Sequence, residues 1–407
     1  MKSTIKITKN PFAWLAFAAV AINIYAHFTI TSIPLITYVL IGAVVMYALS
    51  NSTLKASTSS IYFWYMCLLI VYTIMVAMSN PSGSQNMTKM IIFQLILSVC
   101  FFIYLVSLRR HSDILVVLMA FAVLILCLII VSDEALFKTL SEAADDNTYY
   151  TLGENNRNTI GVILGIGSLY MLYLGVAKNK LWFLAMIATV ALGLITGSRK
   201  VIVSVVFGVL LFTFLYVTYA KKQSSPKKLR AIVFVLLIIG LLLFFCFNNE
   251  TLYNIIGNRI EGLWGTLSGS GEGDASSEER AGMIKRAFEM FLEKPAFGWG
   301  LEGFAKNSGY GVYSHNNFTE TLVSFGIFGF VLFYSYKVAL LVMHFCALKR
   351  EIDKNKCAKM VIVFVAMAIS LILDFAAISM NNIVVNIPYT LAAAQIYLNR
   401  LEKRTSK

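Results

Sequence analysis

The sequence predicts an all-α polytopic membrane protein, and three observations carry this prediction. The chain of 407 residues has a mean hydropathy of +0.74. Only 14% of its residues are charged, whereas soluble domains carry about 25%. Its apolar residues gather into runs that can cross a bilayer, which requires about 17 to 25 residues each. A soluble globular fold is therefore excluded.

The apolar runs predict about twelve transmembrane helices, since each run is long enough to cross the hydrocarbon core. In chain order they lie near 12–28, 33–50, 61–78, 90–107, 113–131, 158–176, 181–197, 201–220, 231–247, 318–345, 360–378 and 383–398.

The formal net charge of +13 would suggest nucleic-acid binding in a soluble protein, so its distribution decides its meaning. With the N-terminus placed in the cytoplasm, the inside connections hold most of the 34 Lys and Arg residues. The outside connections 132–157 and 248–317 hold most of the 21 acidic residues. This positive-inside pattern predicts that both termini are cytoplasmic and that no nucleic acid is bound.

The connections divide the chain into three regions. We expect transmembrane helices 1 to 9 within 1–247, a large extracytoplasmic loop at 248–317, and helices 10 to 12 with a cytoplasmic tail within 318–407. The loop contains a Gly/Ser-rich stretch at 265–277, which is typical of a flexible linker. It continues as "SSEERAGMIKRAFEMFLEK", where Ser276 and Glu279 have capping-box spacing and Pro295 ends the predicted helix.

Two arginines of this predicted loop helix differ in their surroundings. Arg286 falls on the polar side with Glu289 and Glu293, so a solvated ion pair is an alternative to substrate binding. Arg280 falls on the apolar face, where a cation in the first turn opposes the helix dipole and must be desolvated. We therefore expect an anionic partner for Arg280. The apolar face is formed by Ile284, Ala287 and Phe291.

Arg199, Arg280 and His315 converge on the outer face of the membrane in this topology. Arg199 lies in the tight turn of "LITGSRKVIVS", and His315 of "YSHNNF" precedes a span. Two arginines and a histidine suit an anionic substrate and a general base that works near neutral pH. The alternative for Arg199 is a cation that snorkels to the membrane interface, and we expect the same of Lys200. The alternative for His315 is a structural hydrogen bond.

Two acids near these groups are further candidates. Glu320 has capping-box spacing with Asn317, so it either closes a helix start or contacts substrate. Asp374 lies at the end of a span, where a charge is costly, and we expect an arginine partner for it. The sequence shows no His, Cys and acid cluster with metal-ligand spacing on this face and no phosphate-binding loop. Guanidinium groups would then stabilise the anion without a metal.

From "TGSRKVIVS" through "ERAGMIKRAFEMFLEKPAFGWGLEGF" to "YSHNNFTETLVSFGIFGF", the chain resembles the superfamily of O-antigen ligases and Wzy-type polysaccharide polymerases. The resemblance implies a GT-C-like helical fold and a metal-independent glycosyltransferase of the bacterial inner membrane, without a cofactor. It implies a donor linked to undecaprenyl pyrophosphate, contact with membrane lipid, and a chain-length regulator and a flippase as candidate protein partners. We expect inversion at the anomeric carbon from a single displacement, since no outside carboxylate is indicated as a nucleophile.

The same resemblance implies the site residues. The essential arginines of the family fall on Arg199 and Arg280 and its histidine on His315, while Asp374 matches the acid of the penultimate span. The remaining candidates for substrate binding are Asn158 in "GENNRN", Arg286, Asn316 and Glu320.

Residues typical of ligases do not flank Asp374, which favours a repeat-unit polymerase over a ligase that acts on lipid A core. A transporter of lipid-linked glycan is the alternative from another class. A major-facilitator transporter would have a long inside linker between the sixth and seventh spans, but only the short "VAKNK" joins them here. This argues against the transporter.

Overall fold

The fold is known from a computed structural model. It describes residues 10–29, 34–80, 83–108, 113–133, 151–152, 155–196, 198–219, 226–250, 253, 275–351 and 353–405. Of the Gly/Ser-rich stretch predicted at 265–277, residues 265–274 lie outside the described residues.

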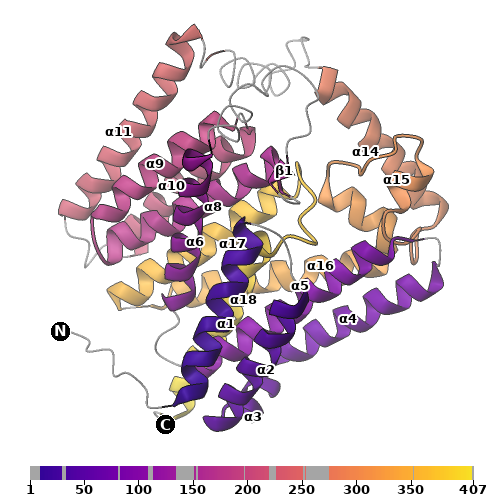
Figure 1. Cartoon of the computed structure of the whole chain (residues 1–407), viewed down its shortest axis with the longest axis horizontal. Helices are drawn as coiled ribbons and strands as arrows, with labels where there is room; N and C mark the ends of the chain where they lie inside the picture. The colour runs from indigo at the N-terminus through magenta and orange to yellow at the C-terminus, as the bar shows by residue number, and fades with distance from the viewer. Residues whose placement is uncertain are drawn as a thin grey trace.

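The described part is almost entirely helical (Figure 1). A two-residue antiparallel ladder joins β1 (Thr151–Leu152) and β2 (Asn155–Asn156). The helices are α1 (Pro11–Thr29), α2 (Pro34–Ser50), α3 (Leu54–Thr58), α4 (Ile61–Ser79), α5 (Gln85–Leu108), α6 (Asp113–Ser132), α8 (Arg157–Ala177), α9 (Leu181–Ile195), α10 (Arg199–Tyr219), α11 (Pro226–Asn248), α14 (Ala275–Glu293), α15 (Gly303–Asn307), α16 (Asn317–Leu348), α17 (Lys354–Leu373) and α18 (Ile383–Thr405).

The helices confirm a multi-pass membrane protein. Within the described residues, seven helices are long and apolar enough to cross a bilayer, and shorter apolar helices lie at Pro11–Ala26, Leu35–Ser50 and Leu181–Ile195. Large apolar side chains such as Trp64, Phe214 and Phe328 are exposed on their outer faces. Such a surface is stable against lipid and would be unfavourable in water. The number of twelve spans stays a prediction.

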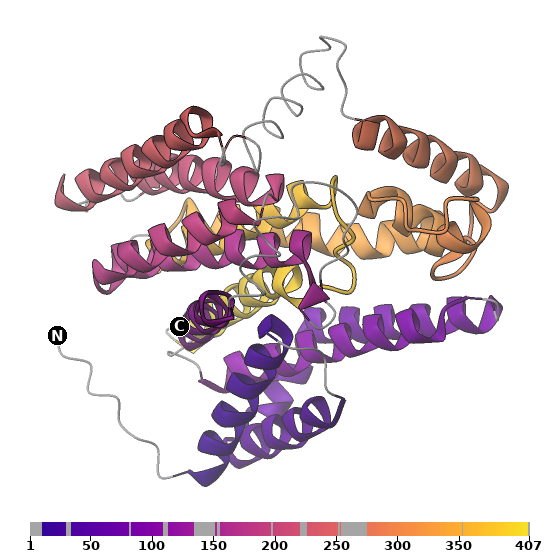
Figure 2. The same cartoon turned by 45° about the horizontal axis from the view of Figure 1, so that its top comes forward.

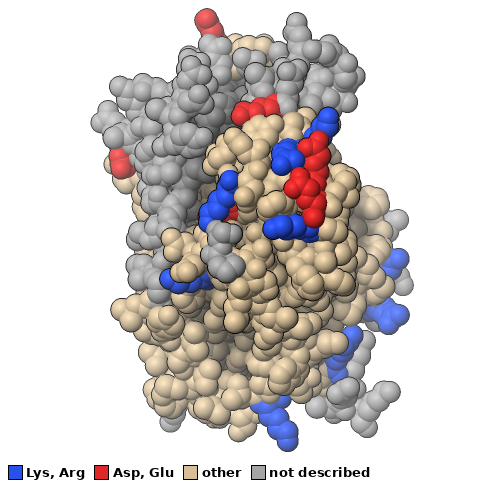
Figure 3. Space-filling view, turned by 90° about the vertical axis from the view of Figure 1, so that its right-hand side faces the viewer, with Lys and Arg blue, Asp and Glu red and all other residues tan. Residues whose placement is uncertain are grey.

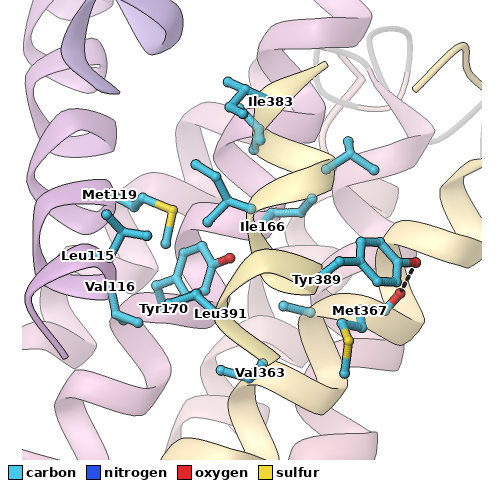
Figure 4. Close-up of a cluster of buried hydrophobic side chains, with 14 of the residues drawn as sticks. Leu115, Val116, Met119, Ile166, Tyr170, Val363, Met367, Ile383, Tyr389 and Leu391 are labelled. Carbon is cyan, nitrogen blue, oxygen red and sulfur yellow. Dashed lines mark hydrogen bonds between the residues drawn. The ribbon is translucent and has the colours of Figure 1, made fainter. Parts of the chain in front are cut away.

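The core extends through most of the membrane helices, and Figure 4 shows its part between α6, α8, α17 and α18. Tyr170 of α8 is fully buried beside side chains of α6, and Tyr389 of α18 donates a hydrogen bond of 3.0 Å to the carbonyl of Met367. The helix α8 contacts α6, α9, α10 and α17, so it is enclosed by protein on most sides. This packing fixes the ends of α8 and α10, where candidate residues lie.

The helices of the predicted large loop pack on one end of α16. Both α14 and α15 contact α16, and Figures 1 and 2 show them together at this end of the molecule. Figure 3 faces this side and shows charged residues of both signs gathered in its upper part, above a broad surface of uncharged residues.

The loop helix predicted before Pro295 is confirmed as α14. It begins at Ala275, one residue before the expected cap at Ser276.

A break in α16 attaches these loop helices to the membrane helices. Gly326 has φ 65° and ψ −171°, and a Cβ there would lie 2.2 Å from the carbonyl oxygen of Ala296, so only glycine fits. Because the helical pattern is interrupted, the carbonyls of residues 323 and 324 accept hydrogen bonds from the N–H groups of Trp299 and Gly300. The N–H of Ile327 donates to the carbonyl of Pro295. The segment after α14 is thus held against α16.

Candidate functional site

A cavity of about 510 Å³ lies where α8, α10, α16 and the segments 301–313 and 373–385 meet. Its volume falls within the range of about 300 to 1,000 Å³ that is usual for small-molecule sites. Its polar and charged lining residues include Asn158, Thr159, Lys200, Glu302, Tyr313, Glu320, Ser324, Ser379, Asn381 and Asn382. Two of the predicted site residues, Asn158 and Glu320, therefore line the cavity.

Lys200, and not Arg199, lines the cavity. Arg199 is the first residue of α10, and neighbouring helix positions point about 100° apart, so the two cations face different sides. A Cβ at Gly161 would lie 2.5 Å from the Cβ of Ser198, so this glycine lets the start of α10 approach α8 closely. Ser198 donates a hydrogen bond of 3.4 Å to Asn158, beside Lys200. Arg199 is half-buried and stays a predicted site residue.

Arg280 lies on the buried face of α14, as predicted. That face is centred on Met283, Ala287 and Met290, which pack against Phe304. The expected companions Ile284 and Phe291 lie at its margins and are half-buried. Arg280 itself is half-buried, and its positive charge interacts electrostatically with the side chains of both Lys200 and His315.

His315 lies within electrostatic reach of these two cations, in a strained backbone conformation. Its φ of 56° is in the left-handed region, where non-glycine residues are uncommon. The neighbouring residues Ser314 and Asn316 are buried, whereas His315 is half-buried and its ring lies 4.4 Å from the ring of Tyr313. Burial, followed by the charges of Arg280 and Lys200, lowers the pKa of His315 to about 4. The imidazole is therefore neutral at physiological pH.

Arg286 lies outside this cluster. Its Nη1 is 3.4 Å from Glu289 Oε2 and 3.3 Å from Glu293 Oε1, so the alternative of a solvated ion pair describes its contacts. It lines a separate open hollow on α14 together with Tyr310. Substrate binding by Arg286 is untested, and these contacts favour the alternative of the surface ion pair.

The start of α16 is capped by Asn316, and not by the expected pair Asn317 and Glu320. The side chain of Asn316 accepts hydrogen bonds from the N–H groups of Phe318 and Thr319. Glu320 is 5% exposed and reaches back past the cap to Ser314, two residues before Asn316, from whose N–H it accepts a hydrogen bond of 2.9 Å. Since Glu320 also lines the cavity, it combines the structural and the site-lining alternatives. Asn316 is committed to the cap, and substrate contact by it stays a prediction.

Asp374 is fully buried and pairs with a lysine, so the expectation of an arginine partner was wrong. Its Oδ2 lies 3.1 Å from Lys337 Nζ and accepts a hydrogen bond from Tyr334. Lys337 lies five turns into α16, a position that a search for arginines near the outer face passes over. The backbone carbonyl of Asp374 accepts a hydrogen bond from the N–H of Asn317. The side-chain oxygen of Asn317 in turn accepts a hydrogen bond from the N–H of Ser379. This network holds the 373–385 wall of the cavity in place.

The geometry thus brings together Arg280, Lys200 and His315 beside a cavity that Asn158 and Glu320 line. Cations that lie next to one another in a half-buried place favour an anionic ligand, and a neutral imidazole among them can accept a proton. Sequence reasoning missed Lys200 and Glu302 as lining residues. The signal for Lys200 was present, because it shares its turn with Arg199.

A comparison with protein families finds one match on this chain, over residues 184–334. The matched region runs from α9 through the half-buried cations of α10 and α14 to His315 and the first half of α16. A search of curated proteins finds no match. The matching family is that of the O-antigen ligases, so residues 184–334 are similar to these proteins, as the sequence motifs predicted.

Proposed function

We propose that this protein is a polysaccharide polymerase of the O-antigen ligase and polymerase type. It transfers a growing glycan from undecaprenyl pyrophosphate to the terminal sugar of another lipid-linked repeat unit. The observation that carries the proposal is the electrostatic effect of two cations, Arg280 and Lys200, on a neutral His315, close to a cavity that Lys200 lines near the ends of membrane helices. The family match over residues 184–334 supports the same type of activity.

In the proposed reaction, the acceptor hydroxyl oxygen attacks the anomeric carbon of the donor. The bond from this carbon to the pyrophosphate oxygen breaks, and the lipid pyrophosphate leaves with the electron pair. Arg280, together with Lys200 and the predicted Arg199, would stabilise the negative charge that develops on it, without a metal. His315 would take the hydroxyl proton. A single displacement inverts the configuration at the anomeric carbon.

We further propose a GT-C-like arrangement with about twelve spans in the bacterial inner membrane, with both termini cytoplasmic and the cavity on the extracytoplasmic side. The charge distribution of the connections supports this orientation. It also agrees with the chemistry, because a lipid pyrophosphate brings its own activation to a compartment without nucleotide sugars.

The ligase remains the second candidate, because the matching family model describes O-antigen ligases. Both enzymes would use the same donor, so the products distinguish them. A polymerase lengthens the lipid-linked chain, and a ligase releases it onto lipid A core.

An assay of membranes that contain the protein tests the proposal. Cells that carry this gene should accumulate the unpolymerised lipid-linked repeat unit when it is deleted, and this material serves as substrate. We expect longer lipid-linked chains, with the same rate in excess chelator, because guanidinium groups cannot be stripped as metals can. Loss of activity that added magnesium restores would contradict the metal-free mechanism. Glycan found only on lipid A core would favour the ligase.

Labelling of single cysteines tests the orientation. A cysteine introduced at Gly271 should react with a membrane-impermeant thiol reagent added from outside. A cysteine at Ser224 should react only after the membrane is opened, because the basic residues at 221, 222, 227, 228 and 230 hold that connection in the cytoplasm. The native cysteines would also react with the reagent and give background labelling, so they are replaced by serine first. The reverse pattern would place the cavity on the cytoplasmic side.

A further inference from the structure

The wall of the cavity carries charges of both signs. Lys200 lines it and, together with Arg280, acts electrostatically on His315. A second group on the wall consists of the acids Glu302 and Glu320. A pyrophosphate is attracted by the first group and repelled by the second. The second group therefore suits a different part of the substrate.

Two buried hydroxyl groups of the wall have no partner within the described residues. Ser324 and Ser379 are each 1% exposed, both line the cavity, and neither Oγ has a hydrogen bond. Buried polar groups are nearly always hydrogen-bonded, and leaving one unpaired costs about 1 to 3 kcal/mol. Both Oγ atoms are covered in this conformation, and rotation about χ1 to another staggered position can turn a serine hydroxyl toward a ligand in the cavity, which would then supply the missing partner.

The backbone places these groups on a common wall. Glu320 and Ser324 are four residues apart on α16 and so lie on the same face of the helix. The N–H of Gly300 donates to the carbonyl of Ser324, which brings the segment of Glu302 to that face. Glu302 has φ 59°, a strained left-handed conformation for a non-glycine residue. Ser379 joins them through its hydrogen bond to Asn317, at the start of the same helix.

The chemistry of this wall matches a sugar. Carboxylates accept hydrogen bonds from hydroxyl groups, and serine hydroxyls both donate and accept. The side chains of Asn381 and Asn382, which also line the cavity, can do both as well. Tyr313 also lines the cavity, and its ring lies 4.4 Å from the ring of His315, so it offers an apolar face to a sugar ring near the proposed base.

We propose that Glu302, Ser324 and Ser379 form the acceptor-sugar subsite and bind hydroxyl groups of the terminal sugar to which the glycan is transferred. This assignment rests on the proposed polymerase function and adds the residues that recognise its acceptor.

The test compares Glu302→Gln, Ser324→Ala and Ser379→Ala with the wild type in purified, full-length protein. Ser370→Ala is the matched control, because Ser370 is also fully buried and unpaired but does not line the cavity. The probe is the oligosaccharide released from the accumulated lipid-linked repeat unit, and inorganic pyrophosphate probes the cationic group. We expect the Kd for the oligosaccharide to rise about 3- to 10-fold in each serine variant and about 10- to 100-fold in Glu302→Gln. The Kd for pyrophosphate and the Ser370→Ala variant should be unchanged.

Kinetics separate the acceptor from the donor. With the lipid-linked donor saturating, the KM for the oligosaccharide as acceptor should rise in the three variants, whereas the KM for the donor should not. An equal rise for the donor would assign the subsite to the donor sugar and overturn the proposal. Unchanged oligosaccharide affinity in all three variants of an active enzyme would also overturn it. If the wild type binds the oligosaccharide through these residues but extends no chain, the polymerase function fails and the sugar site stands.

Discussion

Replacing Arg280 by alanine should lower the rate of chain extension about 100- to 1,000-fold, the effect of removing one donor that stabilises transition-state charge. Arg280 lies on the buried face of α14 and acts on both Lys200 and His315. The measurement is the rate of lengthening of the lipid-linked chain in membranes with equal amounts of protein.

Arg286→Ala is the matched control, because it removes the same side chain from the same helix. Arg286 pairs with Glu289 and Glu293 at the surface, and exposed ion pairs contribute only about 0 to 1 kcal/mol to stability. This variant should fold and keep a rate close to that of the wild type. Arg280→Lys should recover part of the activity, since it keeps the charge but loses the planar fork that binds two oxygens. Equal losses in Arg280→Ala and Arg286→Ala would remove Arg280 from the site.

The difference between these two arginines could be predicted from the sequence because it is a local property. The period of α14 decides which side chains face the core, and the nearby acids decide which arginine is paired at the surface. The membrane helices were predictable for a similar reason, since each apolar run is stable in lipid by itself. The family motifs also lie in continuous stretches, and the match over residues 184–334 confirms them.

Lys200 and Glu302 could not be assigned in this way, because their positions depend on contacts between distant segments. Which of Arg199 and Lys200 faces the cavity follows from the rotation of α10 against α8, which the approach of Ser198 to Gly161 fixes. Glu302 reaches the wall because the segment after Pro295 pairs with the broken turn of α16. The lysine partner of Asp374 was missed for the same reason, since Lys337 lies on another helix, 37 residues away in the chain.

His315→Gln should lower turnover about 100- to 10,000-fold, the usual contribution of a general base, while binding of the lipid-pyrophosphate donor is retained. Glutamine can donate and accept hydrogen bonds but cannot take up a proton at this pH. Donor binding is measured separately, through the Kd for the lipid-linked repeat unit. Near-normal turnover, or a loss of donor binding equal to the loss of turnover, would make His315 a structural or positioning residue. Glu320 and Asp374 would then be the candidates for the base.

The pH profile gives a second, independent test of His315. Its pKa is lowered to about 4, so the neutral form that accepts a proton is present above this value and is lost as the pH falls through it. The acid limb of kcat/KM, which reports the free enzyme, should therefore lie well below the ordinary histidine value of about 6.5. Bound pyrophosphate offsets the charges of Arg280 and Lys200, so the acid limb of kcat should lie at higher pH.

Lys200→Gln should move the acid limb of kcat/KM to higher pH, because one of the two cations that lower the pKa of His315 is removed. Arg286→Ala should leave the limb in place, since Arg286 is paired with its own acids at the surface. An acid limb that stays at the same pH in Lys200→Gln, or that persists unchanged in the residual activity of His315→Gln, would mean that another group accepts the proton. The shift thus connects the base to the cations that hold the leaving group, since burial and then the charges of Arg280 and Lys200 lower the pKa of the imidazole.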